Sequence, residues 1–172
     1  VEMAELIHPV ATDHILDIGS GIGGPARYFA NRFGCKVTGI DLTPEYPDVA
    51  RHLTGLLDLE GRVTFEVGNA LRMPFADASF DGAYSMNVSM NIPQKGEFYR
   101  EIHRVLKPGA WLVLSEVAKG DGEELDYPTP WASSAATSFL STPEETRRGL
   151  LEGGFDVLRL HSSVEETRAF GA

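Results

Sequence analysis

The segment "LDIGSGIGGPARYF", residues 16–29, places an apolar strand, a glycine-rich turn and the start of a helix in direct succession. Two glycine patterns overlap in the turn: G-x-G-x-x-G begins at Gly19, and D-x-G-x-G-x-G begins at Asp17. Glycines in such a turn permit positive φ angles and let the backbone approach a ligand that a Cβ atom would repel. The segment therefore predicts a strand–turn–helix unit that binds a nucleotide-like ligand, and the glycines alone leave the ligand open.

The remainder of the chain alternates short apolar runs with helical periods. Strands are expected at residues 14–19, 36–41, 62–67, 80–85, 111–117 and 155–160, and helices from about 25, from 44, over 95–106 and over 143–153. This alternation predicts an α/β fold, Rossmann-like, with a doubly wound and mostly parallel sheet covered on both faces. The third strand alternates enough to lie near a sheet edge. In such sheets the ligand lies beyond the carboxyl ends of the strands, so the site is expected at the turn after the first strand.

Local signals set several of these boundaries. Thr43 is expected to cap the second helix, with Pro44 at its first helical position. The buried face of that helix is expected to consist of Val49, Leu53, Leu56 and Leu57. The segment "KPGA", residues 107–110, is expected to end the third helix. Thr142 and Glu145 form a predicted capping box at the start of the fourth.

Composition limits the class of protein. The 172 residues are 42% hydrophobic and 23% charged, which predicts one globular domain spanning residues 1–172. A formal charge of −10 disfavours nucleic acid as a partner, and no run of 18 apolar residues predicts a membrane span. The lone Cys35 excludes an internal disulfide and fits a reducing, cytoplasmic location. The oligomeric state is left open. The opening "VEMAELIHPV" has neither an initiator Met nor a secretory pattern, so a chain truncated at one or both ends is expected.

Two carboxylates narrow the choice of ligand. Asp17 precedes Gly19 by two residues, where it would lie close to the pyrophosphate of a dinucleotide, which is unfavourable. Near the ammonium of the methionine moiety of S-adenosylmethionine (SAM), the same carboxylate is favourable. Asp41 follows Gly21 by twenty residues and can accept both ribose hydroxyls of either ligand. Asp17 therefore favours SAM, although it can also cap the amides of the turn.

Four blocks give the chain a family resemblance. These are "ILDIGSGIGG", "VTGIDLTP", "NALRMPFADASFDGAYS" and "EIHRVLKPGAWLVLSE", in this order between residues 12 and 160. Together they resemble the class I SAM-dependent methyltransferases, more narrowly the type 11 small-molecule group. The segment after the first strand is most similar to sterol, tocopherol and sarcosine/dimethylglycine methyltransferases. The resemblance implies a methyltransferase that uses SAM, releases S-adenosylhomocysteine and acts on a small-molecule acceptor.

The resemblance also implies roles for individual residues. It places the methionine and ribose side of the cofactor against Gly19, Ser20, Gly21 and Gly23. It assigns the ribose hydroxyls to Asp41 and the adenine ring to Leu42. The family Asp that accepts the adenine amino group is replaced here by Asn69, followed by Ala70, and the amide keeps an acceptor oxygen. Asn87 resembles the residue beside the methionine moiety and the methyl path, and it can equally be a turn-forming Asn.

The chain departs from the family pattern at two places. Ala110 replaces the second glycine of the family's P-G-G segment, remote from the chemistry. The family fold has a seventh, antiparallel strand beside the fifth. The twelve residues after 160 include "VEETRAF", which is typical of a helix, so the seventh strand is expected to be missing. A shortened N-terminal helix and this missing strand imply weaker SAM binding than in a complete chain.

The acceptor side has only weak signals. Residues 119–142 contain no clear helix or strand and are expected to be either a substrate-covering loop or a solvated excursion. Glu116 is the candidate general base, with a solvated strand end as the alternative. Asn91 and Trp131 are candidate acceptor contacts. The five histidines show no metal-ligand spacing with the lone cysteine, so no metal is expected.

Three alternative functions stay open at this point. An NAD-dependent oxidoreductase is disfavoured by Asp17 and by the later blocks. A SAM-binding or regulatory subunit without catalysis is compatible with the sequence, because the family has no obligatory catalytic side chain whose absence would show. A methyltransferase for macromolecules is disfavoured by the acidic charge.

Overall fold

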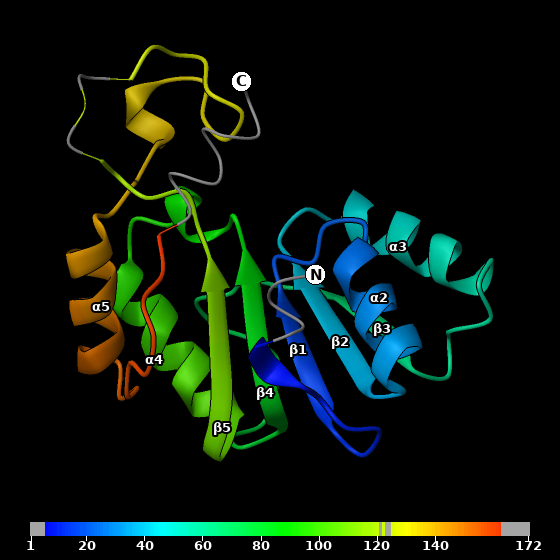
Figure 1. The fold of residues 1–172 in the computed structure, drawn as a ribbon. Helices are drawn as coiled ribbons and strands as arrows, with labels where there is room; N and C mark the ends of the chain where they lie inside the picture. The colour runs from blue at the N-terminus through cyan, green and yellow to red at the C-terminus, as the bar shows by residue number, and fades with distance from the viewer. Residues whose placement is uncertain (1–5, 121, 123–124, 163–172) are drawn as a thin grey trace.

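The computed structural model describes residues 6–120, 122 and 125–162, and within them it has a five-stranded parallel sheet in the order β3-β2-β1-β4-β5 (Figure 1). The strands are β1 (His14–Ile18), β2 (Lys36–Asp41), β3 (Val63–Val67), β4 (Phe80–Met86) and β5 (Leu106–Ser115). The helices are α2 (Gly24–Phe33), α3 (Glu45–Gly55), α4 (Lys95–Val105) and α5 (Pro143–Glu152). Two short 3₁₀ turns are η1 (Ser89–Asn91) and η2 (Ala135–Thr137).

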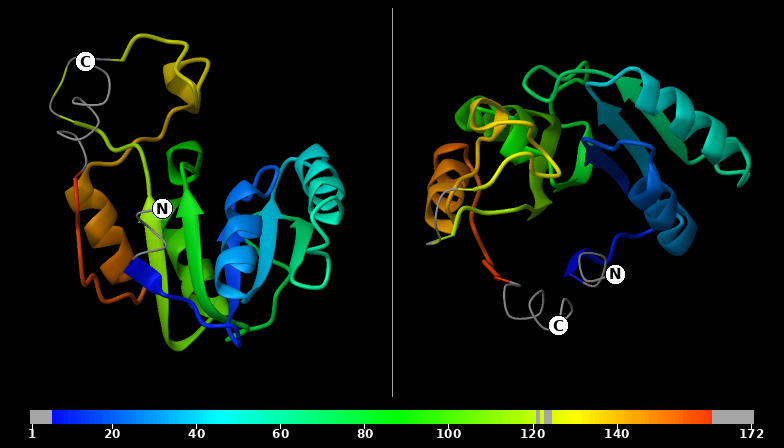
Figure 2. Two further views of the ribbon diagram at one scale, coloured as in Figure 1. Left: turned by 45° about the vertical axis from the view of Figure 1, so that its right-hand side comes forward. Right: turned by 90° about the horizontal axis from the view of Figure 1, so that it is seen from above.

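The strand order reverses direction at β1. From β1 the chain proceeds outward to β2 and β3, then returns to β4 on the other side of β1 and continues to β5. Figure 2 shows the carboxyl end of the sheet from above, with the two halves diverging at this point. A sheet of this type binds its ligand at such a switch point, which the glycine turn after β1 occupies.

The side chains of the sheet alternate between two hydrophobic clusters, as the period of a strand requires. Ile15 packs with α2 and α3 on one face, in a cluster that includes Phe29 and Ala50. Leu16 packs on the other face with residues of α4, including Phe98. The predicted α/β architecture with both faces covered is therefore confirmed, as is the edge position of β3.

The prediction for α3 is wrong at its start and on its buried face. The N-cap is Pro44 rather than Thr43, and no side chain caps the helix. The predicted core residues Val49, Leu56 and Leu57 are exposed, and Leu53 is half-buried. The residues that α3 buries are Pro47, Ala50 and Thr54. These smaller side chains let the helix pack closely against the sheet. Contact with the sheet, and not the positions of Val49, Leu53, Leu56 and Leu57 along the helix, therefore decides which face is buried.

The last part of the predicted sheet also needs correction. β5 begins at Leu106, so the segment 107–110 belongs to the strand, with a register shift opposite β4 between Phe80 and Gly82. Residues 155–160 form no strand in the structure. A strand exists only where a neighbour completes its hydrogen-bond ladder, and no described segment pairs with the outer edge of β5. The segment predicted as a final helix, 164–170, lies outside the described residues.

The long connection 119–142 leaves the carboxyl end of β5 and returns to α5. Its two ends meet, because the Lys119 amide donates to the Ser141 carbonyl at 2.9 Å. Within its described part the segment has only η2 and an isolated bridge between Thr129 and Ala132. It lies above the carboxyl ends of β4 and β5 (Figure 1). The capping box that ends the connection is confirmed, with reciprocal Thr142 and Glu145 hydrogen bonds.

Candidate functional site

The glycine turn folds back over the end of β2. The amides of Gly19 and Ser20 both donate to the Ile40 carbonyl, at 2.8 and 3.1 Å, and this fixes the turn against the neighbouring strand. Gly19 has φ of +70°, and a Cβ atom there would lie 2.3 Å from Val88 Cγ2. Gly23, the N-cap of α2, has φ of +76° and faces Phe65 equally closely. Only glycine fits at these two positions, because a side chain would need a left-handed backbone and would overlap Val88 or Phe65.

Asp17 ends up buried beneath this turn. Its side chain is 2% exposed, and within the described chain neither Asp17 Oδ2 nor the buried Ser20 Oγ makes a hydrogen bond. Burial raises the pKa of Asp17 to about 7, the nearby Tyr84 hydroxyl lowers it in part, and Asp41 raises it further. Buried polar atoms are almost always paired in folded proteins, so these two orphaned oxygens indicate a missing polar partner at the turn.

Asp41 links the end of β2 to the glycine turn. Its Oδ2 accepts a hydrogen bond from the Gly21 amide at 2.8 Å, and its Oδ1 accepts one from the Thr43 amide at 2.9 Å. A carboxylate oxygen can accept two hydrogen bonds, so each keeps capacity for a hydroxyl. A Cβ atom on Gly21 would meet nothing within 4 Å, so the space beside this carboxylate is open.

Three residues predicted to surround an adenine lie at the ends of β2 and β3. Leu42, next to Asp41, is 68% exposed, which is high for a large aliphatic side chain. Asn69 is exposed, and its Oδ1 accepts a hydrogen bond from the Leu71 amide at 2.9 Å. Ala70 is half-buried against the second hydrophobic cluster. The strand order brings all three to the β2–β3 side of the glycine turn.

The opposite side of the turn is formed by the residues that follow β4. Asn87 is exposed and has φ of +56°, the left-handed conformation that asparagine tolerates in turns. Its amide donates to the Ser115 carbonyl at 2.8 Å. Val88, which follows, covers Gly19. Sequence reasoning missed Val88 and Tyr84, because their proximity to the turn depends on β4 lying beside β1.

Glu116, the candidate base, lies just beyond the end of β5. Its Oε2 accepts hydrogen bonds from the amides of Val88 and Ser89, at 3.1 and 3.0 Å, and its Oε1 accepts one from Ser85 Oγ at 3.5 Å. Burial raises the pKa of Glu116, and the hydrogen bonds from Ser89 and Val88 offset part of that rise. The carboxylate is therefore directed at the backbone after β4.

The two candidate acceptor contacts lie on separate segments. Asn91 is exposed at the end of η1, while the Trp131 indole in the long connection donates to Ser138 Oγ at 3.0 Å. A backbone hydrogen bond joins the two segments, from the Phe139 amide to the Met90 carbonyl at 2.8 Å. The turn after β4 therefore contacts the connection 119–142 directly.

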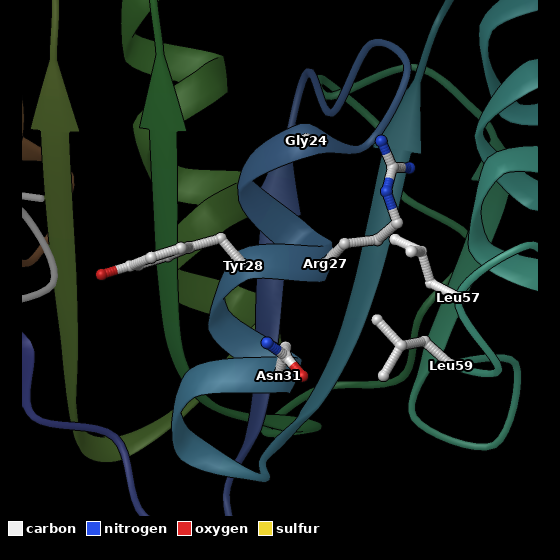
Figure 3. A pocket seen from close by; sticks show the side chains of 6 residues that line it. All are labelled: Gly24, Arg27, Tyr28, Asn31, Leu57 and Leu59. Carbon is white, nitrogen blue, oxygen red and sulfur yellow. The ribbon is translucent and has the colours of Figure 1, made fainter.

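A separate depression lies along the outer flank of α2, between this helix and the chain leading to β3 (Figure 3). It is lined by Gly24, Arg27, Tyr28, Asn31, Leu57 and Leu59. None of the predicted site residues contributes to it. Within the described residues, no group of three or more His, Cys, Asp or Glu side chains is placed to bind a metal, and no helix is long and apolar enough to cross a membrane.

Comparison with known families agrees with this geometry. The family model described as "Methyltransferase domain" matches residues 16–114, from the middle of β1 to the last residue but one of β5. The chain belongs to the methyltransferase domain family. The resemblance expected from the four sequence blocks is therefore confirmed, and so is the Rossmann-like fold class.

Relatives of this methyltransferase-family chain are named for different methyl-transfer reactions. The O-methyltransferase resE of Aspergillus sclerotiorum is 33% identical over 97% of the chain and 64% of its own length. The 24-methylenesterol C-methyltransferase 2 of Oryza sativa subsp. japonica is 33% identical over 91% of the chain and 45% of its own length. The chain thus spans about half to two thirds of the length of these relatives.

Solved structures place the same fold in proteins with different named activities. The [4+2]-cyclase SpnF is 28% identical and superposes with a TM-score of 0.84 over 97% of this chain and 60% of its own. The phosphoethanolamine N-methyltransferase 2 of Haemonchus contortus, solved with S-adenosylhomocysteine, has the same TM-score at 24% identity, over 97% of this chain and 39% of its own. At that identity the second likeness shows the fold alone.

Proposed function

We propose that this chain binds SAM and transfers its methyl group to a nitrogen, oxygen or carbon atom of a small-molecule acceptor. The observation that carries the proposal is the buried Asp17 carboxylate, whose Oδ2 makes no hydrogen bond within the described chain, beneath a glycine turn that Asp41 joins to β2. A cationic ammonium satisfies a buried carboxylate, whereas a pyrophosphate would repel it. Asp17 therefore favours SAM over a dinucleotide.

The proposed cofactor site follows the strand ends around the switch point. Its residues are Asp17, Gly19, Ser20, Gly21, Gly23, Asp41, Leu42, Asn69, Ala70 and Asn87. The exposed Leu42 provides an apolar surface for adenine, and each Asp41 oxygen keeps capacity for a ribose hydroxyl. Asn69 keeps acceptor capacity on its amide oxygen beside the Leu71 amide.

The chemistry that SAM supplies is an in-line displacement: an electron pair of the acceptor forms a bond to the methyl carbon, the carbon–sulfur bond breaks, and the bonding pair of that broken bond stays on sulfur to give S-adenosylhomocysteine. The protein contributes orientation and exclusion of water. An acceptor that carries a proton loses it to solvent or to a base. Glu116 is the candidate base predicted from the sequence, but its Oε2 already accepts hydrogen bonds from two backbone amides.

We further propose that residues 1–172 form one SAM-binding domain, with residues 119–142 covering the acceptor. The hydrogen bond between the Phe139 amide and the Met90 carbonyl supports the covering role, because it attaches the connection to the turn after β4. Asn91 and Trp131 are the proposed acceptor contacts. A formal charge of −10 and a single cysteine support a cytoplasmic enzyme whose partner is a small molecule and not a nucleic acid.

A second candidate function is SAM binding without methyl transfer. The likeness to the [4+2]-cyclase SpnF favours keeping it, because that protein is named for a different reaction and superposes with a TM-score of 0.84. A fold does not by itself set the chemistry of its site.

Calorimetric titration with S-adenosylhomocysteine and with NAD tests the cofactor assignment. The proposal requires binding of the first ligand and no binding of the second. A methyl-transfer screen with amines, phenols, quinols and sterol-like lipids, using labelled SAM, then tests the reaction. Binding of S-adenosylhomocysteine without transfer to any class would favour the second candidate, and binding of NAD alone would overturn both.

A further inference from the structure

We infer that Glu116 is a positioning residue, whose carboxylate holds the turn of residues 87–91 against the glycine turn on one side and the connection 119–142 on the other. The inference rests on the proposed function for its meaning in catalysis. Its structural part concerns contacts within the described chain and can be tested separately.

Glu116 caps the turn η1 in the way an N-cap side chain caps a helix, although it is distant from that turn in the sequence. The turn η1 begins without a side-chain cap of its own, so the amides at its start lack partners within the turn. Glu116 Oε2 accepts both the Val88 amide at 3.1 Å and the Ser89 amide at 3.0 Å. Hydrogen bonds from amides to a charged acceptor are stronger than neutral ones, so one carboxylate oxygen from the end of β5 fixes the turn after β4.

The same turn is held from its other side by Lys95. The Lys95 ammonium donates to the Ser89 carbonyl, so both backbone groups of Ser89 are bonded to charged side chains. Burial lowers the pKa of Lys95, and the charge of Glu116 raises it. Ser89 itself is 6% exposed, so water has little access to its amide in the folded chain. Leaving a buried donor unsatisfied is costly, which makes the carboxylate important to the turn.

The fixed turn contacts both halves of the proposed active site. Val88 lies over Gly19, where an added Cβ atom would come within 2.3 Å of Val88 Cγ2. Asn87, held in its left-handed conformation, directly precedes Val88. On the acceptor side, the Met90 carbonyl accepts from the Phe139 amide at 2.8 Å. Movement of this turn would therefore disturb the cofactor contacts and the connection together.

The positioning role differs from the general-base role in what each requires of the carboxylate. A base must exchange a proton with the acceptor, which requires a titrating oxygen directed at it. A positioning residue requires only an acceptor oxygen at Oε2. Glutamine has that oxygen and no titratable group, so Glu116→Gln separates the two roles while Glu116→Ala removes both.

The first test measures the turn itself, without any ligand. Hydrogen exchange followed by mass spectrometry reports how fast the backbone amides of residues 86–92 exchange with solvent. For Glu116→Ala we expect at least tenfold faster exchange in this peptide and unchanged exchange over β1 and β2. For Glu116→Gln and for Glu97→Gln, an exposed carboxylate on α4, we expect exchange within about threefold of the wild type. Unchanged exchange in Glu116→Ala would overturn the inference.

The second test measures function with S-adenosylhomocysteine as the probe and, once an acceptor is found, with the pH dependence of kcat. We expect Glu116→Ala to bind the probe at least tenfold more weakly, and Glu116→Gln to bind it within about threefold. We also expect Glu116→Gln to keep the pH profile of the wild type. If the rise of kcat with pH were lost in Glu116→Gln, Glu116 would instead be a general base. If the wild type binds no probe, the proposed function fails while the exchange result still decides the role of Glu116 in the turn.

Discussion

Asp17 and Tyr84 lie directly opposite each other in the register of β1 and β4, and both side chains are buried. Neither Asp17 Oδ2 nor the Tyr84 hydroxyl makes a hydrogen bond in the part of the chain that the structure describes. Burial raises the pKa of both groups, with that of Asp17 reaching about 7. A carboxyl group with this pKa changes its charge within the physiological pH range, and binding of a cation next to it must release a proton below pH 7.

Cofactor affinity should therefore depend on pH. The ionised form of Asp17 binds the ammonium, so we expect the affinity for S-adenosylhomocysteine to rise roughly tenfold between pH 6 and pH 8. Calorimetry across this range, in buffers of different ionisation enthalpy, measures both the affinity and the proton release. Asp17→Asn is the matched control. Titration of the ligand amine affects the affinity of both proteins equally, so the variant should lose only the part of the pH dependence that Asp17 causes. An equally steep pH dependence in the variant would contradict the role of Asp17.

The same group should make the ligand-free protein less stable at alkaline pH. The pKa of Asp17 in the folded state, about 7, lies above its ordinary value of 3.8, so the folded state binds more protons between these values. The contribution of Asp17 to stability therefore decreases as pH rises toward 7. We expect Asp17→Asn to raise the free energy of unfolding at pH 8 by up to about 4 kcal/mol, with the gain shrinking toward pH 4. Urea unfolding at both pH values measures it, and a pH-independent difference would refute the expectation.

Asp41 should contribute to cofactor binding in two ways. Its carboxylate holds the Gly21 and Thr43 amides and keeps capacity for the ribose hydroxyls. We expect Asp41→Ala to weaken S-adenosylhomocysteine binding by about 1–3 kcal/mol, and Asp41→Asn to weaken it less. Isothermal calorimetry gives these values. Asp48→Asn, an exposed carboxylate on α3, should leave the affinity unchanged, and wild-type affinity in Asp41→Ala would remove Asp41 from the proposed site.

Gly19 should tolerate no side chain while Val88 covers it. Alanine at this position would combine the left-handed φ of +70° with a contact of 2.3 Å to Val88 Cγ2. We expect Gly19→Ala to cost about 1–2 kcal/mol of stability from backbone strain alone, with further loss from the clash. Thermal or urea unfolding measures this. The double variant Gly19→Ala/Val88→Ala should recover the part due to the clash, and Gly61→Ala, which has open space and no positive φ, should have little effect.

Much of this fold follows from local sequence signals. Short apolar runs predicted the buried strands β1, β2 and β4, and the alternating pattern of β3 predicted an edge strand, because burial on one or both faces of a strand leaves a local signal. The glycine turn and the capping box of Thr142 and Glu145 were predicted because their backbone requirements select particular residues at fixed spacing. The predictions failed where a partner decides the outcome. The face of α3 was set by close packing of Ala50, and residues 155–160 found no strand to pair with.

The sequence by itself determined the glycine turn, the order along the chain of the five strands and four helices that the described residues form, and the position of Asp17 and Asp41 at the ends of β1 and β2. Only the tertiary structure decided that β4 lies beside β1. That arrangement places Tyr84 next to Asp17 and Val88 over Gly19, and the pairing of β4 with β5 lets Glu116 reach the turn after β4. These contacts join residues 28 to 69 positions apart, and their physical basis is the pairing of strands rather than any pattern along the chain.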